Sequence, residues 1–398
     1  MGAGRGSGEG EGRQVVKGAD VVGGVNLLGG VNLLGLRSHN TALVLDLLRT
    51  AGADGISRLE LADRTGLTPQ AVSKITARLR ADGLATEAGR RASTGGKPRT
   101  VLRLVPEAGH AVGVHLERDE MRVVLADLTG AVVGERRAAV DLGAGAEAVV
   151  EGVAGEVGQL VEGVAEGAAR TVARIAGRAL TVGSLLGVGI ALPGPLDHSL
   201  GVLHRVTGFP EWDGFPLRDA LARRLGVPVV VDKDTNAAAL GLAVRGEGGS
   251  FAYLHLGTGL GAGLVIGGAV HRGARTGAGE FGHQVVQLDG PPCTCGNRGC
   301  VEALCLAAAA RDDLPEAARV LGTGAGNLVA LLDVDLVLLG GRTVAADPDI
   351  FVRGVGAVLA ERARRVGEDP VPVRLAPGEV AEGAAQLLLA PLFGRADG

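Results

Sequence analysis

The chain has 398 residues, enough for two or three domains with sizeable hydrophobic cores. Apolar residues make up 46% and aromatic residues only 2%, which excludes a disordered chain and leaves Ala, Val and Leu to build the core. The net charge of −4 is uneven, because residues 36–103 carry +6, residues 1–35 carry none and residues 104–398 carry −10. A basic module joined to an acidic one suggests that one end meets a polyanion, although a chance fluctuation would give the same imbalance.

No run of 18 apolar residues occurs, so no transmembrane helix is expected. The glycine-rich residues 1–35 lack the apolar centre of a signal peptide and are expected to be disordered. All four cysteines lie between Cys293 and Cys305, as expected for thiols that stay reduced inside the cell. We therefore expect a cytoplasmic protein with no membrane partner.

Residues 36–106 are predicted to contain a helix-turn-helix. In the stretch SRLELADRTG, Ser57 can cap a helix and Glu60 can complete a capping box, while Gly66 marks the helix end. Thr68 then caps the helix TPQAVSKITARLRADG, with Pro69 at its first position. Two capped helices joined by a short turn are typical of a helix-turn-helix. A preceding helix is predicted to bury a face made of Leu43, Val44, Leu47 and Leu48.

The next stretch, LATEAGRRASTGGKPRTVLRL, predicts a strand, a basic glycine-rich loop and a second strand, which together form a wing. The first turn of the preceding helix could enter the major groove, while cations of the wing could neutralise phosphates. The alternative is a plain helical hairpin with a solvated charged loop, but caps, spacing, wing and charge together favour double-stranded DNA. The residues expected to contact DNA are Thr68, Gln70, Ala71, Ser73, Lys74, Arg78, Arg90, Arg91, Lys97 and Arg99.

Residues 107–398 alternate strand-like and helix-like patterns. The stretch LGVPVVVDKDTNAAALG predicts a strand that runs into a helix, and FAYLHLGTGLGAGLVIGG predicts two strands joined by a glycine-rich loop. Residues 112–130, VGVHLERDEMRVVLADLTG, predict a β-hairpin with a charged turn. Buried strands that alternate with helices indicate an α/β architecture.

The stretch GHQVVQLDGPPCTCGNRGCVEA predicts a metal site. His283 precedes Cys293 by ten residues, and Cys295 and Cys300 complete a C-x-C-x4-C spacing. Three thiolates and one imidazole suit tetrahedral Zn²⁺ with no open position, and hence a structural role. A disulfide or a redox pair is the alternative, which the reducing compartment and the available imidazole disfavour. Cys305 follows on an alanine-rich helix and is expected in the core.

The segments NTALVLDLLRT, SRLELADRTGLTPQAVSKITARLRADGLATE and STGGKPRTVLRL resemble the winged-helix module of ROK (repressor, open reading frame, kinase) regulators. The segments of residues 107–398 resemble the ROK sugar-kinase-like domain in the same order, including its zinc pattern. The resemblance implies an α/β protein with a winged helix-turn-helix at residues 36–106. It also implies a two-lobed, actin/hexokinase-like (ribonuclease H-like) domain at residues 107–398, with a zinc-binding loop at 283–300, and assembly into a homodimer or a dimer of dimers.

The resemblance further implies a sugar site. In ROK sugar kinases the residue that matches Asp234 is the general base that activates the sugar hydroxyl. Taken one by one, the matching residues could equally be ordinary surface carboxylates. The chain also departs from the family, because Lys233 replaces an Asn and Gly208 replaces another Asn four residues before Trp212. The expected sugar-binding residues are Asp234, Glu280, His283 and Glu302.

The charged hairpin turn bears on nucleotide binding. A phosphate cradle needs backbone N–H groups near the anion and no side chain in the way. ROK kinases provide an Asp-x-Gly-Gly-Thr turn, whereas this chain offers His115, Glu117, Arg118 and Asp119. The other loops of the nucleotide side, GTGLGAG at 257–263 and the glycine pair 340–341, match the family. We therefore expect the ATP-binding motif to be degenerate.

These expectations combine into a sequence-specific DNA-binding transcriptional regulator, a repressor, that senses a sugar or sugar derivative and is not an enzyme. The rival hypothesis is an ATP-dependent sugar kinase with an appended DNA-binding domain, which the retained Asp234 favours and the hairpin opposes. A third alternative is a regulator that needs no ligand or responds to a protein partner.

Overall fold

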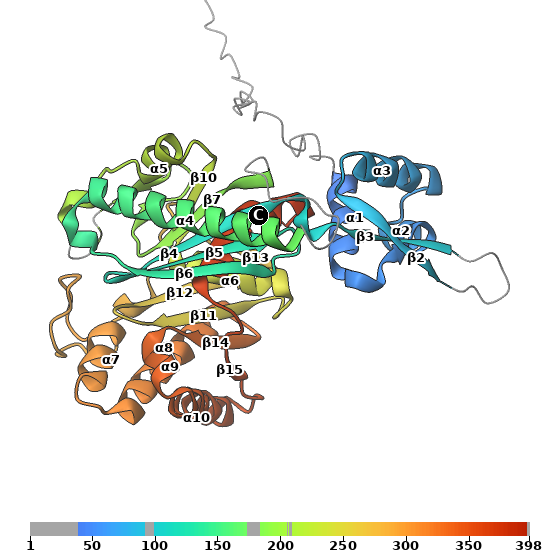
Figure 1. Ribbon diagram of the computed structural model, residues 1–398. Helices are drawn as coiled ribbons and strands as arrows, with labels where there is room; N and C mark the ends of the chain where they lie inside the picture. The colour runs from blue at the N-terminus through green and yellow to red at the C-terminus, as the bar shows by residue number, and fades with distance from the viewer. Residues whose placement is uncertain (1–38, 92–98, 173–183, 205, 207–208, 396–398) are drawn as a thin grey trace, which may run out of the picture.

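The computed structural model describes residues 39–91, 99–172, 184–204, 206 and 209–395. A small unit beginning at α1 lies beside a larger body with two lobes, and the end of the described chain returns to the small unit (Figure 1). The predicted disordered segment 1–35 and the predicted DNA contact Lys97 lie outside the described residues. Among the described residues, no helix has both the length and the apolar character needed to cross a membrane.

The small unit has the element order of a winged helix. Its three antiparallel strands lie in the order β1, β3, β2, so that β2 and β3 form the two arms of the predicted wing. The bounds are α1 His39–Thr50, η2 Gly52–Asp54, β1 Ile56–Ser57, α2 Arg58–Thr65, α3 Pro69–Ala81, β2 Ala85–Arg91 and β3 Arg99–Leu104.

The predicted helix caps are present. Glu60 donates its backbone N–H to Ser57 Oγ at 3.3 Å, and Ser57 donates its own N–H to Glu60 Oε2 at 2.8 Å, which completes the capping box. Gly66 ends α2 in the left-handed conformation at φ 68°. Thr68 Oγ1 accepts the N–H of Ala71 at 3.2 Å at the start of α3.

The buried face of α1 differs from the prediction. Val44 and Leu48 are fully buried as expected, but Leu45 is buried with them while Leu43 and Leu47 are only half-buried. The face is rotated because the C-terminal segment of the chain also packs on α1, and Phe393 joins the same core cluster.

The first lobe is built on a five-stranded sheet in the order β10-β7-β4-β5-β6. Strands β4 and β5 form the predicted antiparallel hairpin, whereas β7 and β10 run parallel to β4. Helix α4 covers β5 and β6, and α5 packs on β10 (Figure 1). The bounds are β4 His110–Leu116, β5 Glu120–Asp127, β6 Val132–Ala139, α4 Ala146–Val172, β7 Leu185–Leu192, α5 Leu217–Leu225 and β10 Val229–Lys233.

The second lobe has a sheet in the order β13-β12-β11-β14-β15, with helices packed on its outer face (Figure 1). Strands β11 and β12 are antiparallel and are joined by the predicted glycine-rich loop. The bounds are β11 Phe251–Leu256, β12 Leu260–Ile266, β13 Ala269–Val270, α7 Val301–Ala309, α8 Leu314–Leu332, β14 Leu336–Gly340, α9 Arg342–Ala346, α10 Pro348–Val366 and β15 Val373–Leu375.

Helices α6 (Asp234–Arg245) and α11 (Val380–Leu389) lie between the lobes and pack against each other. Glycine makes this possible, because a Cβ on Gly113 of β4 would lie 1.9 Å from Ala381 O and one on Gly189 of β7 would lie 1.9 Å from Ala384 O. On α11 itself, a Cβ on Gly383 would lie 2.1 Å from the carbonyl oxygen of residue 237 in α6. The α/β fold with a winged helix and two lobes is therefore confirmed.

Candidate functional sites

The N-terminal half of α3 forms an exposed polar surface. Its inner face is fixed by the buried residues Val72, Thr76 and Leu79, so its outer face is left to solvent. The hydrogen bond from Arg58 Nε to Thr76 Oγ1, 3.3 Å long, joins α2 to α3. The predicted contacts that are exposed on α3 or at its cap are Thr68, Gln70, Ser73, Lys74 and Arg78, while Ala71 is half-buried.

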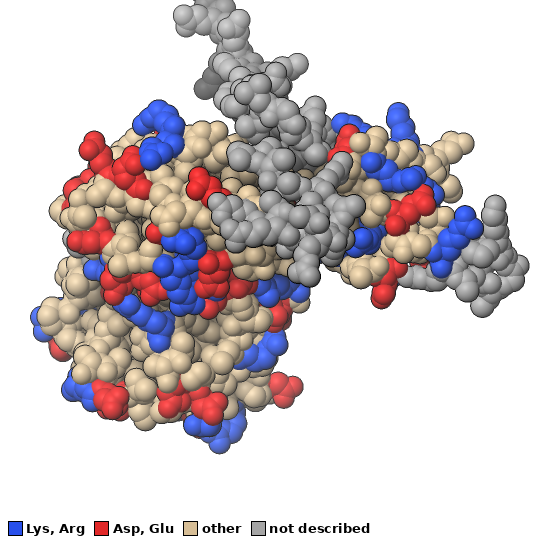
Figure 2. Space-filling model, in the orientation of Figure 1, with Lys and Arg blue, Asp and Glu red and all other residues tan. Residues whose placement is uncertain are grey.

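The wing adds positive charge next to this surface. Arg90 on β2 and Arg99 on β3 are both exposed, and Arg91 pairs with Arg99 in the antiparallel register. Several Lys and Arg side chains lie on the winged helix at the right of the view in Figure 2. The structure therefore brings the exposed part of α3 and the base of the wing together on one small unit.

The winged helix is held to the larger body by the end of the chain. The segment η8 (Ala390–Phe393) follows α11 and packs on α1. The Arg49 guanidinium lies over the Phe393 ring, 5.1 Å from its centroid, and Arg395 Nη2 lies 3.0 Å from Asp46 Oδ2. One continuous segment thus runs from between the lobes to the winged helix.

The predicted sugar-binding residues line one cleft between the lobes. This sugar-side cleft has a volume of about 240 Å³. Asp234 is the first residue of α6 and directly follows β10, so the end of a buried strand carries it into the cleft. Glu280, His283 and Glu302 line the same cleft from the loop before η7 (Phe281–His283), from η7 itself and from α7.

Hydrogen bonds within the protein already engage several of these groups. Lys233, only 3% exposed, places Nζ 2.6 Å from the carbonyl oxygen of Ala278 and 3.2 Å from Glu280 Oε1. Leu260 donates its backbone N–H to Glu302 Oε2 at 2.8 Å. Asp234 Oδ1 accepts the N–H of the next residue at 2.6 Å. The cleft is therefore rich in carboxylate acceptors, and its buried ammonium has a carboxylate partner.

The predicted metal ligands His283, Cys293, Cys295 and Cys300 come together. Their ligand atoms all lie within 4.8 Å of one another, with 3.7 Å between His283 Nδ1 and Cys293 Sγ and 3.7 Å between Cys295 Sγ and Cys300 Sγ. Gly299, at φ 65°, lets the loop close, because a Cβ there would lie 1.7 Å from the carbonyl oxygen of residue 287. Three sulfur donors and one imidazole at these separations fit a four-coordinate metal ion.

Cys305 is not part of this cluster. It lies in α7, is fully buried and donates from Sγ to the carbonyl oxygen of Ala317 in α8, 3.5 Å away. Burial raises the pKa of its thiol to about 12, so the side chain stays protonated and packs as a small core residue.

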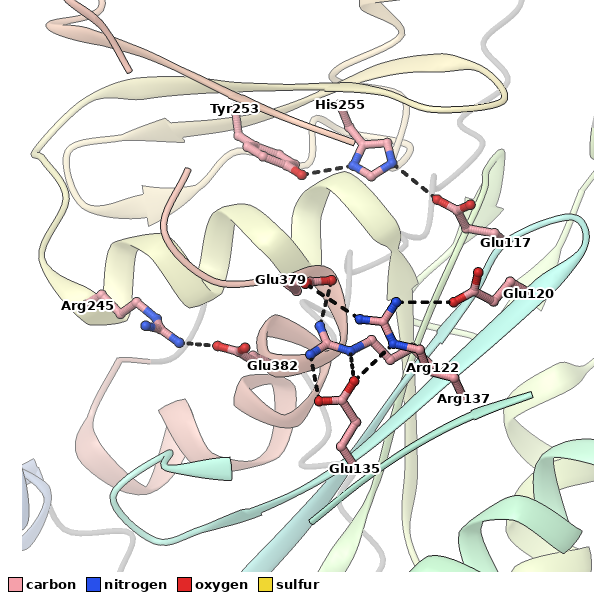
Figure 3. Close-up of polar contacts among 10 residues, drawn as sticks. All are labelled: Glu117, Glu120, Arg122, Glu135, Arg137, Arg245, Tyr253, His255, Glu379 and Glu382. Atoms are coloured by element: carbon pink, nitrogen blue, oxygen red, sulfur yellow. Dashed lines mark hydrogen bonds and ion pairs between the residues drawn. The ribbon is translucent and has the colours of Figure 1, made fainter. Parts of the chain in front are cut away.

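A second cleft, of about 420 Å³, lies on the nucleotide side. Gly340, Gly341 and Arg342 line it, and Glu117 and His255 line both this cleft and the sugar-side cleft. Glu117 Oε1 lies 3.6 Å from His255 Nε2, as Figure 3 shows. This pair, called the wall below, lies at the boundary between the two clefts.

Arg342 reinforces the wall from the second lobe. Its Nη1 lies 3.7 Å from Glu117 Oε2 and 3.1 Å from Asp119 Oδ1. The contact with His255 lowers the pKa of Glu117 the most and Arg342 adds to the effect, so the carboxylate stays ionised. The charged hairpin turn thus lies against His255 and Arg342 of the opposite lobe.

His115 lies behind this wall. Its ring Nε2 is shielded from solvent and has no hydrogen-bond partner among the described residues. Burial, followed by repulsion from His255, lowers the pKa of His115 to about 4, so the ring is neutral at physiological pH. His115 therefore adds no charge to the nucleotide-side cleft that it lines.

A cluster of ion pairs ties the start of α11 to the first lobe. Arg122 of β5 lies 2.8 Å from Glu135 and 2.6 Å from Glu379, the residue before α11, and Arg137 reaches Glu379 at 4.0 Å. Figure 3 shows these pairs and the contact between Glu382 and Arg245 of α6. The sequence analysis missed this cluster, because its members are far apart in the chain and belong to no motif.

Two family profiles match the chain. Residues 160–316 match the ROK family, and residues 44–86 match the winged helix-turn-helix DNA-binding family. Among curated proteins, the xylose repressor of Caldicellulosiruptor bescii is 31% identical over 250 residues, which cover 62% of this chain and 59% of that protein. The transcriptional dual regulator NagC of Escherichia coli is 30% identical over 278 residues, which cover 68% of this chain and 63% of that protein. The chain spans about three fifths of the length of these two relatives.

Kinases of the same family are also similar. The glucokinase of Thermotoga maritima is 44% identical, but over 133 residues that cover 32% of this chain and 42% of that enzyme. A solved ROK family transcriptional regulator, described as a homologue of the E. coli MLC protein, shares the fold with a TM-score of 0.67 at 21% identity, covering 89% and 97% of the two chains. A ROK family glucokinase from Streptomyces griseus, solved with glucose and AMPPNP, has a TM-score of 0.55 at 25% identity. The match covers 70% of this chain and 99% of that one.

The fold and these matches define the class as a ROK sugar-kinase-like domain preceded by a winged helix-turn-helix. The chain therefore carries a ROK family domain and an N-terminal winged helix-turn-helix.

The shielded His115 predicts a pH dependence of stability. Its folded-state pKa lies below that of the unfolded chain, so the unfolded chain binds the proton first as the pH falls. As the pH falls from about 7 to about 5, the free energy of unfolding of the wild-type protein should therefore fall by about 2 kcal/mol more than that of His115→Leu. Urea unfolding of both proteins at each pH measures this difference, and a difference that does not change with pH would contradict the placement of His115.

Proposed function

We propose that this protein is a sequence-specific transcriptional repressor that binds DNA through its winged helix and senses a sugar or sugar derivative. The observation that carries the proposal is the wall of Glu117 and His255 in a domain joined to a DNA-binding unit. The domain keeps the kinase scaffold and the sugar-side cleft, but a carboxylate lies where phosphoryl transfer would have to take place. Repressors among its relatives support the same reading.

The proposed DNA complex places the start of α3 in the major groove of a double-stranded operator. Gln70 and Ser73 are exposed, short and polar, which suits contacts with base edges. Arg90, Arg91, Lys97 and Arg99 of the wing contact phosphates. Thr68, Ala71, Lys74 and Arg78 complete the contact surface. A two-fold homodimer would read palindromic half-sites about one helical turn apart, or a multiple of it.

Asp234, Glu280, His283 and Glu302 are the proposed sugar contacts. All four line one cleft between the lobes, and sugar hydroxyls can donate to the carboxylates. A sugar that changes the angle between the lobes also moves α11, which packs against both α6 and the first sheet. Because η8 follows α11 and packs on α1, the motion reaches the winged helix.

A second candidate function is an ATP-dependent sugar kinase, and one observation favours it. Asp234 is present at the position that matches the family's general base, and the chain is 44% identical to a glucokinase over 133 residues. The hairpin opposes it, since Glu117 and Asp119 are bound to His255 and Arg342. We propose that the protein is not an enzyme and resides in the cytoplasm.

The Cys and His cluster is proposed to hold one structural Zn²⁺ through His283, Cys293, Cys295 and Cys300. The four donor atoms converge, and four protein ligands leave no open position for a substrate. Bound zinc would hold the loop before α7 closed, and would so position His283 and Glu302 at the edge of the sugar-side cleft.

Arginine and glutamine substitutions test the DNA-binding surface. Arg90→Ala should weaken binding to every DNA sequence and reduce the salt slope by about 0.9 per lost phosphate contact. Gln70→Ala should instead change base preference, because the binding free energy that distinguishes the preferred base from the others should fall by about 1–3 kcal/mol. Arg353→Ala, an exposed arginine on α10, is the matched control and should change neither. Binding is measured by titration of DNA selected from a random pool, and an unchanged preference with Gln70→Ala would place other residues in the groove.

A phosphoryl-transfer assay separates the two candidate functions. Wild-type protein with MgATP and D-glucose, D-xylose or N-acetyl-D-glucosamine should release ADP no faster than the Asp234→Asn variant, because the wall separates the two clefts. Sugar-dependent turnover that disappears in Asp234→Asn would instead establish the kinase function.

Metal removal tests the proposed zinc site. Purified protein should contain about one zinc ion per chain, and Cys295→Ser should lose it and melt at a lower temperature. Cys305→Ser is the matched control and should keep the metal, since this thiol is buried beside α8. Zinc-free wild-type protein with an unchanged melting temperature would refute a structural role.

A further inference from the structure

We infer that the effector is an uncharged monosaccharide, and that the cleft discriminates against its phosphate esters. The inference rests on the proposed sugar-sensing function and names the class of ligand. Two observations support it. Carboxylates of the protein already lie beside the glycine-rich loop, and the remaining groups of the cleft can both donate and accept hydrogen bonds.

The glycine-rich loop between β11 and β12 already has carboxylates of the protein beside it. Leu260 donates its N–H to Glu302 Oε2, and a Cβ on Gly259 would lie only 3.2 Å from that same oxygen. At the start of the loop, Glu117 Oε1 would lie 3.5 Å from a Cβ on Gly257. Both ends of the loop therefore face a fixed negative charge, and a phosphate placed there would have to displace it or be repelled.

The cations of the sugar-side cleft are too few to neutralise its carboxylates. Four carboxylates line it, from Glu117, Asp234, Glu280 and Glu302, against the cations Lys233 and Arg118, and Arg342 of the nucleotide-side cleft reaches Glu117 at 3.7 Å. Lys233 is paired with Glu280, and Arg118 lies over the ring of Phe209 at 5.3 Å. Asp234 has no cationic partner among the described side chains. A ligand phosphate would add negative charge to a cleft that already carries an excess of it.

The buried ammonium is part of the structure of the cleft. Gly194 leaves the room for it, since a Cβ there would lie 2.7 Å from Cδ of Lys233. From β10, Lys233 reaches Ala278 and Glu280 in the loop that leads to η7. It thus fixes a carboxylate acceptor and presents a donor beside it, which suits a ligand that both donates and accepts hydrogen bonds.

Sugar hydroxyls have this property and phosphate oxygens do not. A hydroxyl donates to Asp234 or Glu302 and can accept from Lys233, whereas an ionised phosphate group only accepts. The volume of about 240 Å³ also lies below the roughly 300–1,000 Å³ that drug-sized ligands occupy, which suits a single sugar ring. Glu117 and His255 line both this cleft and the nucleotide-side cleft, so they lie at the boundary between the two.

Calorimetric titration of the full chain with matched pairs tests this inference. The pairs are D-glucose and glucose 6-phosphate, N-acetyl-D-glucosamine and its 6-phosphate, and D-xylose and xylose 1-phosphate. At least one free sugar should bind, and its ester should bind at least about tenfold more weakly, or about 1.4 kcal/mol. An ester that binds as tightly as its free sugar would overturn the inference.

Two variants connect the discrimination to the wall. Glu117→Gln removes one fixed charge from the sugar-side cleft, so the ratio of the ester and free-sugar dissociation constants should shrink severalfold. Glu120→Gln is the matched control, because Glu120 lines only the nucleotide-side cleft, and it should leave the ratio unchanged. A ratio that does not respond to Glu117→Gln would remove Glu117 from the explanation and overturn its assigned role.

Binding to selected DNA is measured in the same preparations, so that the two levels of the argument fail separately. Loss of specific DNA binding would contradict the proposed repressor function. Specific DNA binding with no response to any of the three free sugars, in titration or on the operator complex, would overturn the inference and leave the DNA-binding function standing.

Discussion

The close approach of two helices between two sheets is the constraint on which the rest of the structure depends. Helices α6 and α11 contact each other and the strands around them at backbone distance, and the strands carry glycine where a methyl group would collide with a carbonyl oxygen, at Gly113 and Gly189. A small residue is needed because interiors are close-packed and have no free volume for one more carbon.

This packing also positions the chemistry. Asp234 begins α6, so its place in the cleft follows from where α6 lies, and Glu379 precedes α11, so the ion pairs with Arg122 follow from where α11 lies. The hairpin turn that carries Glu117 extends from β4, the strand whose Gly113 touches α11. The same scaffold thus holds both the proposed sugar contacts and the charged turn, whose Glu117 lies against His255 and Arg342 at the junction of the two clefts.

Local signals in the sequence predicted most of the fold. The capping box of Ser57 and Glu60, the strand that runs into α6, the hairpin of β4 and β5 and the convergence of three cysteines on His283 all follow from neighbouring residues or regular spacing. The partners of Lys233 and Glu117 could not be predicted, because each pair joins segments that only the tertiary fold brings together. The prediction of the buried face of α1 was wrong for the same reason, since the packing of η8 on α1 decides part of that face.

The packing of η8 on α1 has a consequence for biosynthesis. Leu389 and Phe393 belong to the same buried cluster as Val44 and Leu48, although some 350 residues separate the two ends, so this cluster is completed only when the last part of the chain has left the ribosome. A nascent chain can fold its N-terminal helices early, but α1 cannot pack against η8 until η8 has been synthesised. The orientation of the winged helix therefore depends on residues 389–393, and a truncated product that stops before them would lack the contact that fixes it.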